Sequence, residues 1–144
     1  ISNFEYKSKK IHVFGLDINN QNKSTKIMNK IFNQYGIKEF DIIIDDGSHN
    51  LSDIVTALKF FFKYLKKKGL YIIEDFKYPN YYSYNKNIDH ILIDEVFKKI
   101  KTKKIFNSNI LTEKEQLDLM NKINEIEIYK GNLKDSDISF MIKN

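Results

Sequence analysis

Two apolar runs that each end in a pair of acids constrain the fold of this chain most strongly. The first is "FDIIIDDGSHN" at 40–50, and the second is "GLYIIEDF" at 69–76. Between the two runs, apolar residues recur with the 3.6-residue period of an amphipathic helix. Those residues are Leu51, Ile54, Val55, Leu58, Phe61, Phe62 and Leu65. A strand, a helix and a strand of these lengths predict a βαβ unit with parallel strands and a right-handed crossover.

Within this unit, we expect strands at 40–44 and 70–73 and a helix over about 51–66. After Asp41, both strands are apolar without alternation, which is typical of strands that are covered on both faces. Gly69 is expected just past the C-terminal end of the helix, because glycine commonly follows the last helical turn.

Upstream of this unit, "IHVFGL" at 11–16 predicts a strand that ends at Asp17. A polar stretch then leads to a helix. We expect Ser24 to cap this helix and Gly36 to end it, because serine is a favoured N-cap residue and glycine a favoured C-cap residue.

Downstream, the sequence predicts helices at 89–100 and near 117–123, the second preceded by a capping box of Thr112 and Glu115. The chain closes with two short strands, "EIEIYK" and "SDISFMIK", which we expect to pair antiparallel around a turn at 131–132. The predicted fold class is therefore α/β: a Rossmann-like open, mainly parallel sheet with helices on both faces and an antiparallel C-terminal hairpin.

The 144 residues suit one domain, 1–144, with a single core. Cysteine is absent, which fits a reducing cytoplasm, and no apolar run approaches the roughly 20 residues that cross a bilayer. Because the sequence begins at Ile1 rather than at methionine, we expect this domain to be the C-terminal portion of a longer chain.

A formal net charge of +5 raises the question of nucleic acid as a partner. The lysines are spread over several segments, such as "KKKG" and "KTKK", and the chain contains no arginine. Without arginine, bidentate recognition of guanine or phosphate would fall to lysine, which fits these groups less well. The composition therefore argues against nucleic acid.

The acids at the strand ends predict a site. If the two strands are neighbours, their carboxyl ends lie about 4.8 Å apart, at the edge where parallel sheets bind ligands. Asp45, Asp46, Glu74 and Asp75 would crowd together there, with His49 at the start of the helix. Carboxylates this close repel one another, and a hard divalent cation such as Mg²⁺ removes the conflict. A single acid in such a place is most often a helix cap, so the prediction rests on the joint pattern.

These two runs resemble the central part of the class I S-adenosylmethionine-dependent methyltransferases. More narrowly, they are similar to the Mg²⁺-dependent sugar O-methyltransferases that act on macrolide deoxysugars, whose pattern is D-D-G-S-H, a helix, and then G-G-x-Y-x-I-E-D. The close match covers about 36 residues. The resemblance implies S-adenosylmethionine and Mg²⁺ as cofactors and a small-molecule or saccharide acceptor, and it leaves a homo-oligomer open.

Carried over by position, the resemblance implies that Asp46, Glu74 and Asp75 are metal ligands. It implies that His49 is the general base for a substrate hydroxyl. Asp45 would lie at the floor of the cofactor pocket. Gly47, which lets the backbone turn sharply between strand and helix, is a further candidate cofactor contact. Asp17 would face the cofactor or the substrate, either as the ribose-binding acid of the second strand or as part of the third strand.

The glycine-rich turn that such methyltransferases use for the cofactor is missing, since no two of the five glycines are near neighbours. Either this turn lies upstream of Ile1, or the domain is a relative that no longer binds the methyl donor and serves as a binding or scaffold module. The tyrosines of the loop at 78–84 either stack on a sugar ring or pack on the surface.

Overall fold

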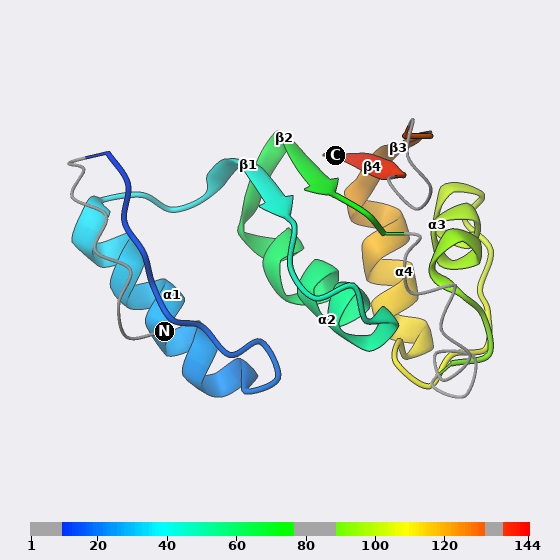
Figure 1. The fold of residues 1–144 in the computed structure, drawn as a ribbon, viewed down its shortest axis with the longest axis horizontal. Coiled ribbons are helices and arrows are strands. Elements are labelled where there is room, and N and C mark those ends of the chain that lie inside the picture. Colours follow the sequence, from blue (N-terminus) through cyan, green and yellow to red (C-terminus); the bar gives the residue numbers. More distant parts are fainter. Residues whose placement is uncertain (1–9, 77–88, 132–136) are drawn as a thin grey trace.

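The computed structural model describes residues 10–76, 89–131 and 137–144. Its centre is a four-stranded open sheet in the order β1-β2-β4-β3 (Figure 1). The strands are β1 (Phe40–Asp45), β2 (Leu65–Ile73), β3 (Ile123–Tyr129) and β4 (Ile138–Lys143). β1 and β2 run parallel, whereas β2–β4 and β4–β3 are antiparallel pairs. The α/β class, the parallel βαβ unit and the C-terminal hairpin are confirmed. The sheet is mixed rather than mainly parallel, because β4 enters between β2 and β3.

The helices are α1 (Gln21–Tyr35), α2 (Leu51–Phe61), the short 3-10 helix η1 (Phe62–Tyr64), α3 (Ile93–Lys101) and α4 (Glu113–Lys122). Figure 1 shows α2 and α4 beneath the sheet, α3 beside α4, and α1 at the opposite end, beyond β1. Among the described residues, no helix combines the length and apolar character of a membrane span.

The main core lies between the sheet and the layer of α2, α3 and α4. Side chains of alternate strand residues, such as Tyr71, Ile73 and Met141, are at most 1% exposed on this face. On the opposite face, Ile42 and Ile44 of β1 are 56% and 60% exposed. The expected cover on both faces is therefore not seen among the described residues. The buried face accounts for alternate residues of the runs, whereas Ile42 and Ile44 lie on the exposed face.

The start of α1 differs from the prediction, whereas its end agrees. Asn20, not Ser24, is the N-cap, since its side chain accepts a hydrogen bond from the Lys23 N–H. Ser24 is buried inside the first turns, where its hydroxyl donates to the Asp17 carbonyl oxygen at 2.5 Å. Gly36 ends the helix in the left-handed conformation, with φ of 65°.

Residues 11–16 do not form the predicted strand, apart from one bridge position at Ile11. A strand needs a neighbour for its backbone hydrogen bonds, and the four described strands pair only with one another. The segment packs on α1 instead, where the His12 and Phe14 rings lie 4.4 and 6.1 Å from the Tyr35 ring.

The region around Gly69 also differs from the prediction. α2 ends at Phe61, and β2 begins at Leu65, so Gly69 lies inside a strand and does not end a helix. Phe40 pairs with Leu65 and Ile42 with Leu70, so β2 bulges over residues 66–69. A Cβ atom on Gly69 would lie 2.8 Å from the Lys66 carbonyl oxygen, and this close approach explains the glycine.

The capping box of Thr112 and Glu115 is confirmed at the start of α4. α3 begins at Ile93 rather than at residue 89, because the Asp89 carboxylate is used elsewhere. It accepts hydrogen bonds from the Ser108 hydroxyl at 2.5 Å and from the Asn109 N–H at 2.8 Å. The tyrosines at 78–84 and Asn132 of the predicted turn at 131–132 lie outside the described residues.

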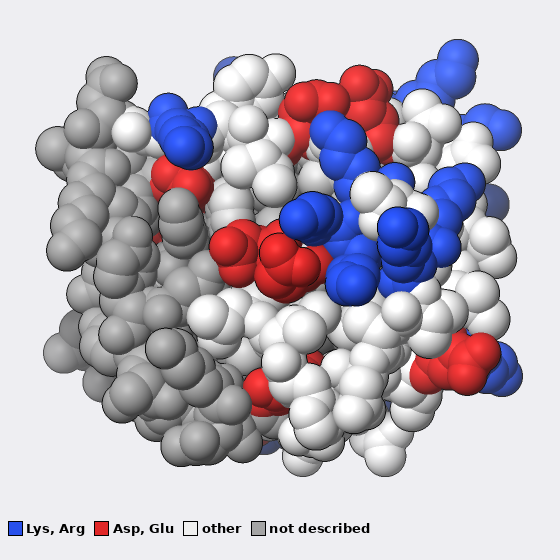
Figure 2. Space-filling model, turned by 90° about the vertical axis from the view of Figure 1, so that its right-hand side faces the viewer, with Lys and Arg blue, Asp and Glu red and all other residues white. Residues whose placement is uncertain are grey.

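The charged surface mixes both signs. Figure 2 shows lysines gathered directly beside acidic side chains on the face at the α3 end of the molecule. Lys101 of α3 forms an ion pair with Glu127 of β3 at 3.3 Å, and Lys98 pairs with Glu95 at 3.6 Å. This mixture of signs agrees with the spread of the lysines over several segments of the sequence.

Candidate metal centre

The carboxyl ends of β1 and β2 lie side by side, as the sequence predicted. Asp45 is in register with Ile73, and the Glu74 N–H donates to the Asp45 carbonyl oxygen at 3.0 Å. This hydrogen bond extends the parallel pairing one residue beyond β2. As a result, Asp46, which follows Asp45, and Asp75, which follows Glu74, start from neighbouring points on the sheet edge.

Asp46, His49 and Asp75 come together at this edge. Each residue offers one ligand atom, a carboxylate oxygen or an imidazole nitrogen, and these atoms lie within 4.8 Å of one another. Asp46 is exposed, whereas His49 and Asp75 are half-buried. Asn50 follows at once as the N-cap of α2, its side chain accepting from the Ser52 N–H at 3.0 Å. The start of the helix therefore fixes the turn that carries the imidazole.

The backbone of Asp75 is in the left-handed region, with φ of 49°. Non-glycine residues are uncommon there, although aspartate tolerates the conformation better than most. Such conformations cost of order 1–3 kcal/mol and are concentrated at functional sites. Here the left-handed conformation of Asp75 ends the alternation of side chains along β2. Asp75 is also the residue from this segment that lies beside Asp46 and His49.

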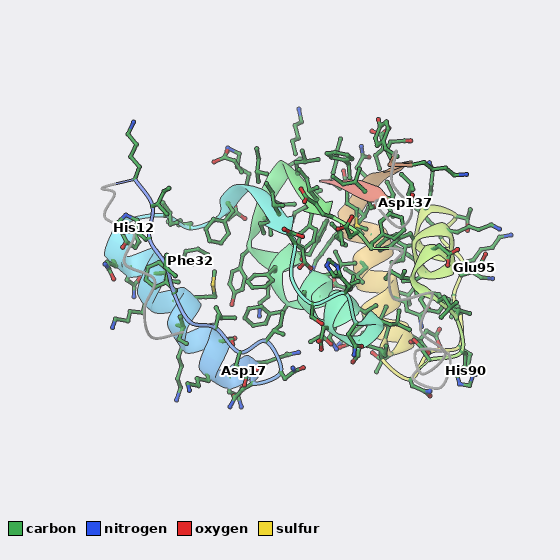
Figure 3. The ribbon with its side chains drawn as sticks, viewed as in Figure 1. His12, Asp17, Phe32, His90, Glu95 and Asp137 are labelled. Carbon is green, nitrogen blue, oxygen red and sulfur yellow. The ribbon has the colours of Figure 1, made fainter. Side chains whose placement is uncertain are left out.

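Glu74 and Asp17 are predicted site residues that lie outside this group. In the described part of the chain, the ligand atoms that converge are those of Asp46, His49 and Asp75. Asp17 lies beside the N-terminal end of α1, away from the strand ends (Figure 3). There one of its carboxylate oxygens accepts from the Asn19 N–H at 3.1 Å. Metal binding by Glu74 and cofactor binding by Asp17 stay predictions.

Asp45 is not part of this group, and its half-buried carboxylate contacts Gly47 and Tyr71 instead. One carboxylate oxygen accepts from the Gly47 N–H at 3.3 Å, and the other accepts from the Tyr71 hydroxyl at 3.4 Å. Burial raises the pKa of Asp45, and these two hydrogen bonds and the nearby His49 oppose that rise only in part. Burial, together with the Asp45 charge, raises the pKa of Tyr71 well above its usual value.

Gly47 is constrained by its contact with Asp45. A Cβ atom at this position would lie 3.2 Å from the Asp45 carboxylate oxygen that accepts from the Gly47 N–H. A side chain here would therefore push the carboxylate away from the turn. Cofactor binding by Asp45 and Gly47 stays a prediction, and the contact seen is one between the two residues themselves.

A cavity of about 270 Å³ lies alongside β1 and reaches Asp45. Its other lining residues are apolar or aromatic: Met28, Phe40, Ile42, Ile43, Ile44, Phe61 and Tyr71. In the sequence, Tyr71 is an ordinary residue of an apolar strand, and a role for its hydroxyl was not predicted. The only available signal was the position of this phenol near the end of the apolar run, three residues before Glu74.

The residues present fit a hard divalent cation. Asp46 and Asp75 contribute carboxylate oxygens, the ligand type that Mg²⁺ prefers, and Mg²⁺ commonly binds one or two carboxylates and keeps several waters. The imidazole of His49 is a poorer ligand for Mg²⁺ than for softer metals. Its position beside two carboxylates suits proton transfer at the same edge.

The other two histidines lie away from this group. His12 packs on Tyr35 of α1, and His90 is exposed before α3; Figure 3 shows the two at opposite ends of the molecule.

The elements around this edge form a methyltransferase fold. Two solved structures of "MycE methyltransferase from the mycinamycin biosynthetic pathway" share it, one in complex with Mg, SAH and mycinamycin VI and the other with Mg and SAH. Their TM-scores are 0.62 and 0.58 at 20% sequence identity. The alignments cover 95% and 91% of this chain but only 33% and 31% of the neighbour.

Two curated relatives carry related names. The L-olivosyl-oleandolide 3-O-methyltransferase of Streptomyces antibioticus is 32% identical over 77 residues, which is 44% of this chain and 19% of the relative. The mycinamicin VI 2''-O-methyltransferase of Micromonospora griseorubida is 36% identical over 58 residues, which is 40% of this chain and 14% of the relative. No protein-family model matches the chain. The chain thus spans about a third of its solved neighbours and matches less than a fifth of these curated relatives.

Proposed function

We propose that this chain is part of an S-adenosylmethionine-dependent O-methyltransferase that methylates a hydroxyl of a sugar or of a glycosylated natural product. One observation carries the proposal: Asp46, His49 and Asp75 converge within 4.8 Å at the strand ends of a methyltransferase fold. The names of the relatives support the acceptor class, since both are O-methyltransferases, one named for L-olivosyl-oleandolide and the other for mycinamicin VI.

Asp46 and Asp75 would hold a Mg²⁺ ion, with Glu74, the residue directly after β2, as a third ligand. Two of these carboxylates start from strand ends that are joined by the hydrogen bond between the Glu74 N–H and the Asp45 carbonyl. When bound, the ion supplies charge that lowers the pKa of a coordinated sugar hydroxyl and fixes the orientation of a vicinal diol.

His49 would act as the general base that takes the proton of the acceptor hydroxyl. A base must lie within hydrogen-bonding reach of that proton, and the half-buried imidazole shares the edge with both carboxylates. S-Adenosylmethionine supplies the methyl group, and the protein supplies position and charge. The candidate cofactor contacts on this chain are Asp17, Asp45 and Gly47. The absence of cysteine suits a cytoplasmic enzyme.

The test is methyl transfer by the complete natural protein, with mycinamicin VI as the first acceptor and labelled S-adenosylmethionine as the donor. We expect His49→Ala to lower the rate by about 10²–10⁴-fold, the usual contribution of a general base. His90→Ala is the matched control, because His90 is an exposed histidine outside the site. We also expect EDTA to abolish methyl transfer. In His49→Ala, cofactor binding measured by calorimetry should survive.

A His49→Ala protein that transfers methyl groups at the wild-type rate would refute the base assignment. A complete natural protein that binds no S-adenosylmethionine in calorimetry, and methylates none of a panel of glycosylated hydroxyl acceptors, would instead favour the binding or scaffold module.

A further inference from the structure

A buried contact under the candidate metal centre joins the end of β1 to β2. Tyr71 is fully buried, and its hydroxyl donates to an Asp45 carboxylate oxygen at 3.4 Å. The second carboxylate oxygen accepts from the Gly47 N–H at 3.3 Å. We propose that Tyr71 and Asp45 are positioning residues that hold the turn at 46–49, and with it Asp46 and His49, against Asp75. This inference rests on the proposed function, because it names the residues that hold the proposed metal and base site in place.

The strand register explains why these two side chains meet. Tyr71 is in register with Ile43, and Asp45 with Ile73, on a parallel pair of strands. Side chains two residues apart on a strand share a face, so Ile43, Asp45, Tyr71 and Ile73 all face the α2 side. The long phenol of Tyr71 then reaches along this face to the next position, which is Asp45.

The contacts of Asp45 converge on the residues that neighbour the candidate ligands. Its backbone carbonyl accepts from the N–H of Glu74, the residue before Asp75. Its side chain holds the N–H of Gly47, the residue after Asp46. A single residue therefore connects the two chain segments that carry the group, and the buried Tyr71 hydroxyl fixes its carboxylate.

Positioning of this kind matters because a ligand set works only in a narrow range of geometries. Metal ligands must lie within about 0.2 Å of ideal distances, and functional side chains need support from residues behind them. Asp46 is exposed and lies in a turn, so little packing holds it directly. The hydrogen bond from Gly47 to Asp45 supplies a fixed point one residue away.

The test compares Tyr71→Phe with Tyr64→Phe in the complete natural protein. Both changes remove one phenol oxygen, but Tyr64 is a half-buried residue of η1 outside the site. We measure binding of Mn²⁺ alone by calorimetry, the melting temperature, and the His49 ring signals in metal-free NMR spectra. Asp45→Ala removes both side-chain contacts of Asp45, whereas Asp45→Asn keeps an acceptor for Gly47 and a polar partner for Tyr71.

We expect Tyr71→Phe and Asp45→Ala to weaken Mn²⁺ binding at least tenfold and to shift the His49 ring signals more than those of His12 and His90. Asp45→Asn should bind within about threefold of the wild type, and Tyr64→Phe should match it. Wild-type Mn²⁺ affinity and unshifted His49 signals in Tyr71→Phe would overturn the inference, even if its melting temperature fell.

If the wild-type protein binds no Mn²⁺, the metal part of the proposed function fails. The metal-free His49 signals then decide the inference separately: a shift in Tyr71→Phe sustains it, and unchanged signals overturn it.

Discussion

Gly69→Ala is expected to destabilise the protein strongly, because the bulge in β2 leaves no room for a methyl group. The added Cβ would lie 2.8 Å from Leu65 Cγ and 2.8 Å from the Lys66 carbonyl oxygen. Carbon atoms normally pack at about 3.5–4.0 Å. Leu65 is fully buried, so its side chain has no open space to enter, and the carbonyl belongs to the strand itself. Overpacking typically costs 1–3 kcal/mol, and a clash with backbone places this change near the upper end, at about 3 kcal/mol.

The assay is urea unfolding of the complete natural protein, followed by circular dichroism at 25 °C. Gly15→Ala is the control, since nothing lies within 4 Å of a Cβ at that position. It should change the free energy of unfolding by less than about 0.5 kcal/mol. A Gly69→Ala protein as stable as Gly15→Ala would refute the reasoning about the bulge. The change matters for the site, because β2 carries Glu74 and Asp75 at its end.

Three further changes test other parts of the structure. Burial raises the pKa of Tyr71, so the unfolded state loses this proton at lower pH than the folded state. Above the usual pKa of 10.0, the unfolding free energy of the wild type should therefore fall by up to about 1.4 kcal/mol per pH unit more than that of Tyr71→Phe, and equal pH dependence of the two proteins would contradict this. Gln116→Ala leaves three buried backbone hydrogen bonds unmade and should cost about 2–4 kcal/mol in urea unfolding, against almost nothing for the exposed Gln34→Ala. Thr112→Ala should cost about 1 kcal/mol through loss of the capping box, and Thr112→Ser should restore it.

The sequence was most informative where local chemistry decides the structure. The capping box at Thr112, the end of α1 at Gly36 and the two acidic strand ends were all predicted correctly. Each depends on a residue type with a strong backbone preference, or on an apolar run long enough to identify a buried strand. Those strand ends also placed Asp46, His49 and Asp75 at one edge, although the prediction included Asp45 and Glu74, whose ligand atoms are not part of the group.

The sequence was less informative where a distant partner decides. Asn20 and Ser24 are both good N-cap residues in one polar stretch, and the burial of Ser24 selects Asn20. Gly69 resembled a helix end, but the pairing of β1 with β2 makes it part of a bulge. The hydroxyl of Tyr71 was missed because an apolar strand gives no sign of which side chain ends beside a carboxylate.

The central claim is that Asp46 and Asp75 hold a divalent cation beside His49. The most direct measurement is the anomalous diffraction of Mn²⁺ in crystals of the complete natural protein. We predict one strong peak at the ends of β1 and β2, with carboxylate oxygens of Asp46 and Asp75 about 2.0–2.2 Å away and His49 next to it. Crystals grown with Mn²⁺ that show no peak at this edge, or a peak bound by other residues, would contradict the account.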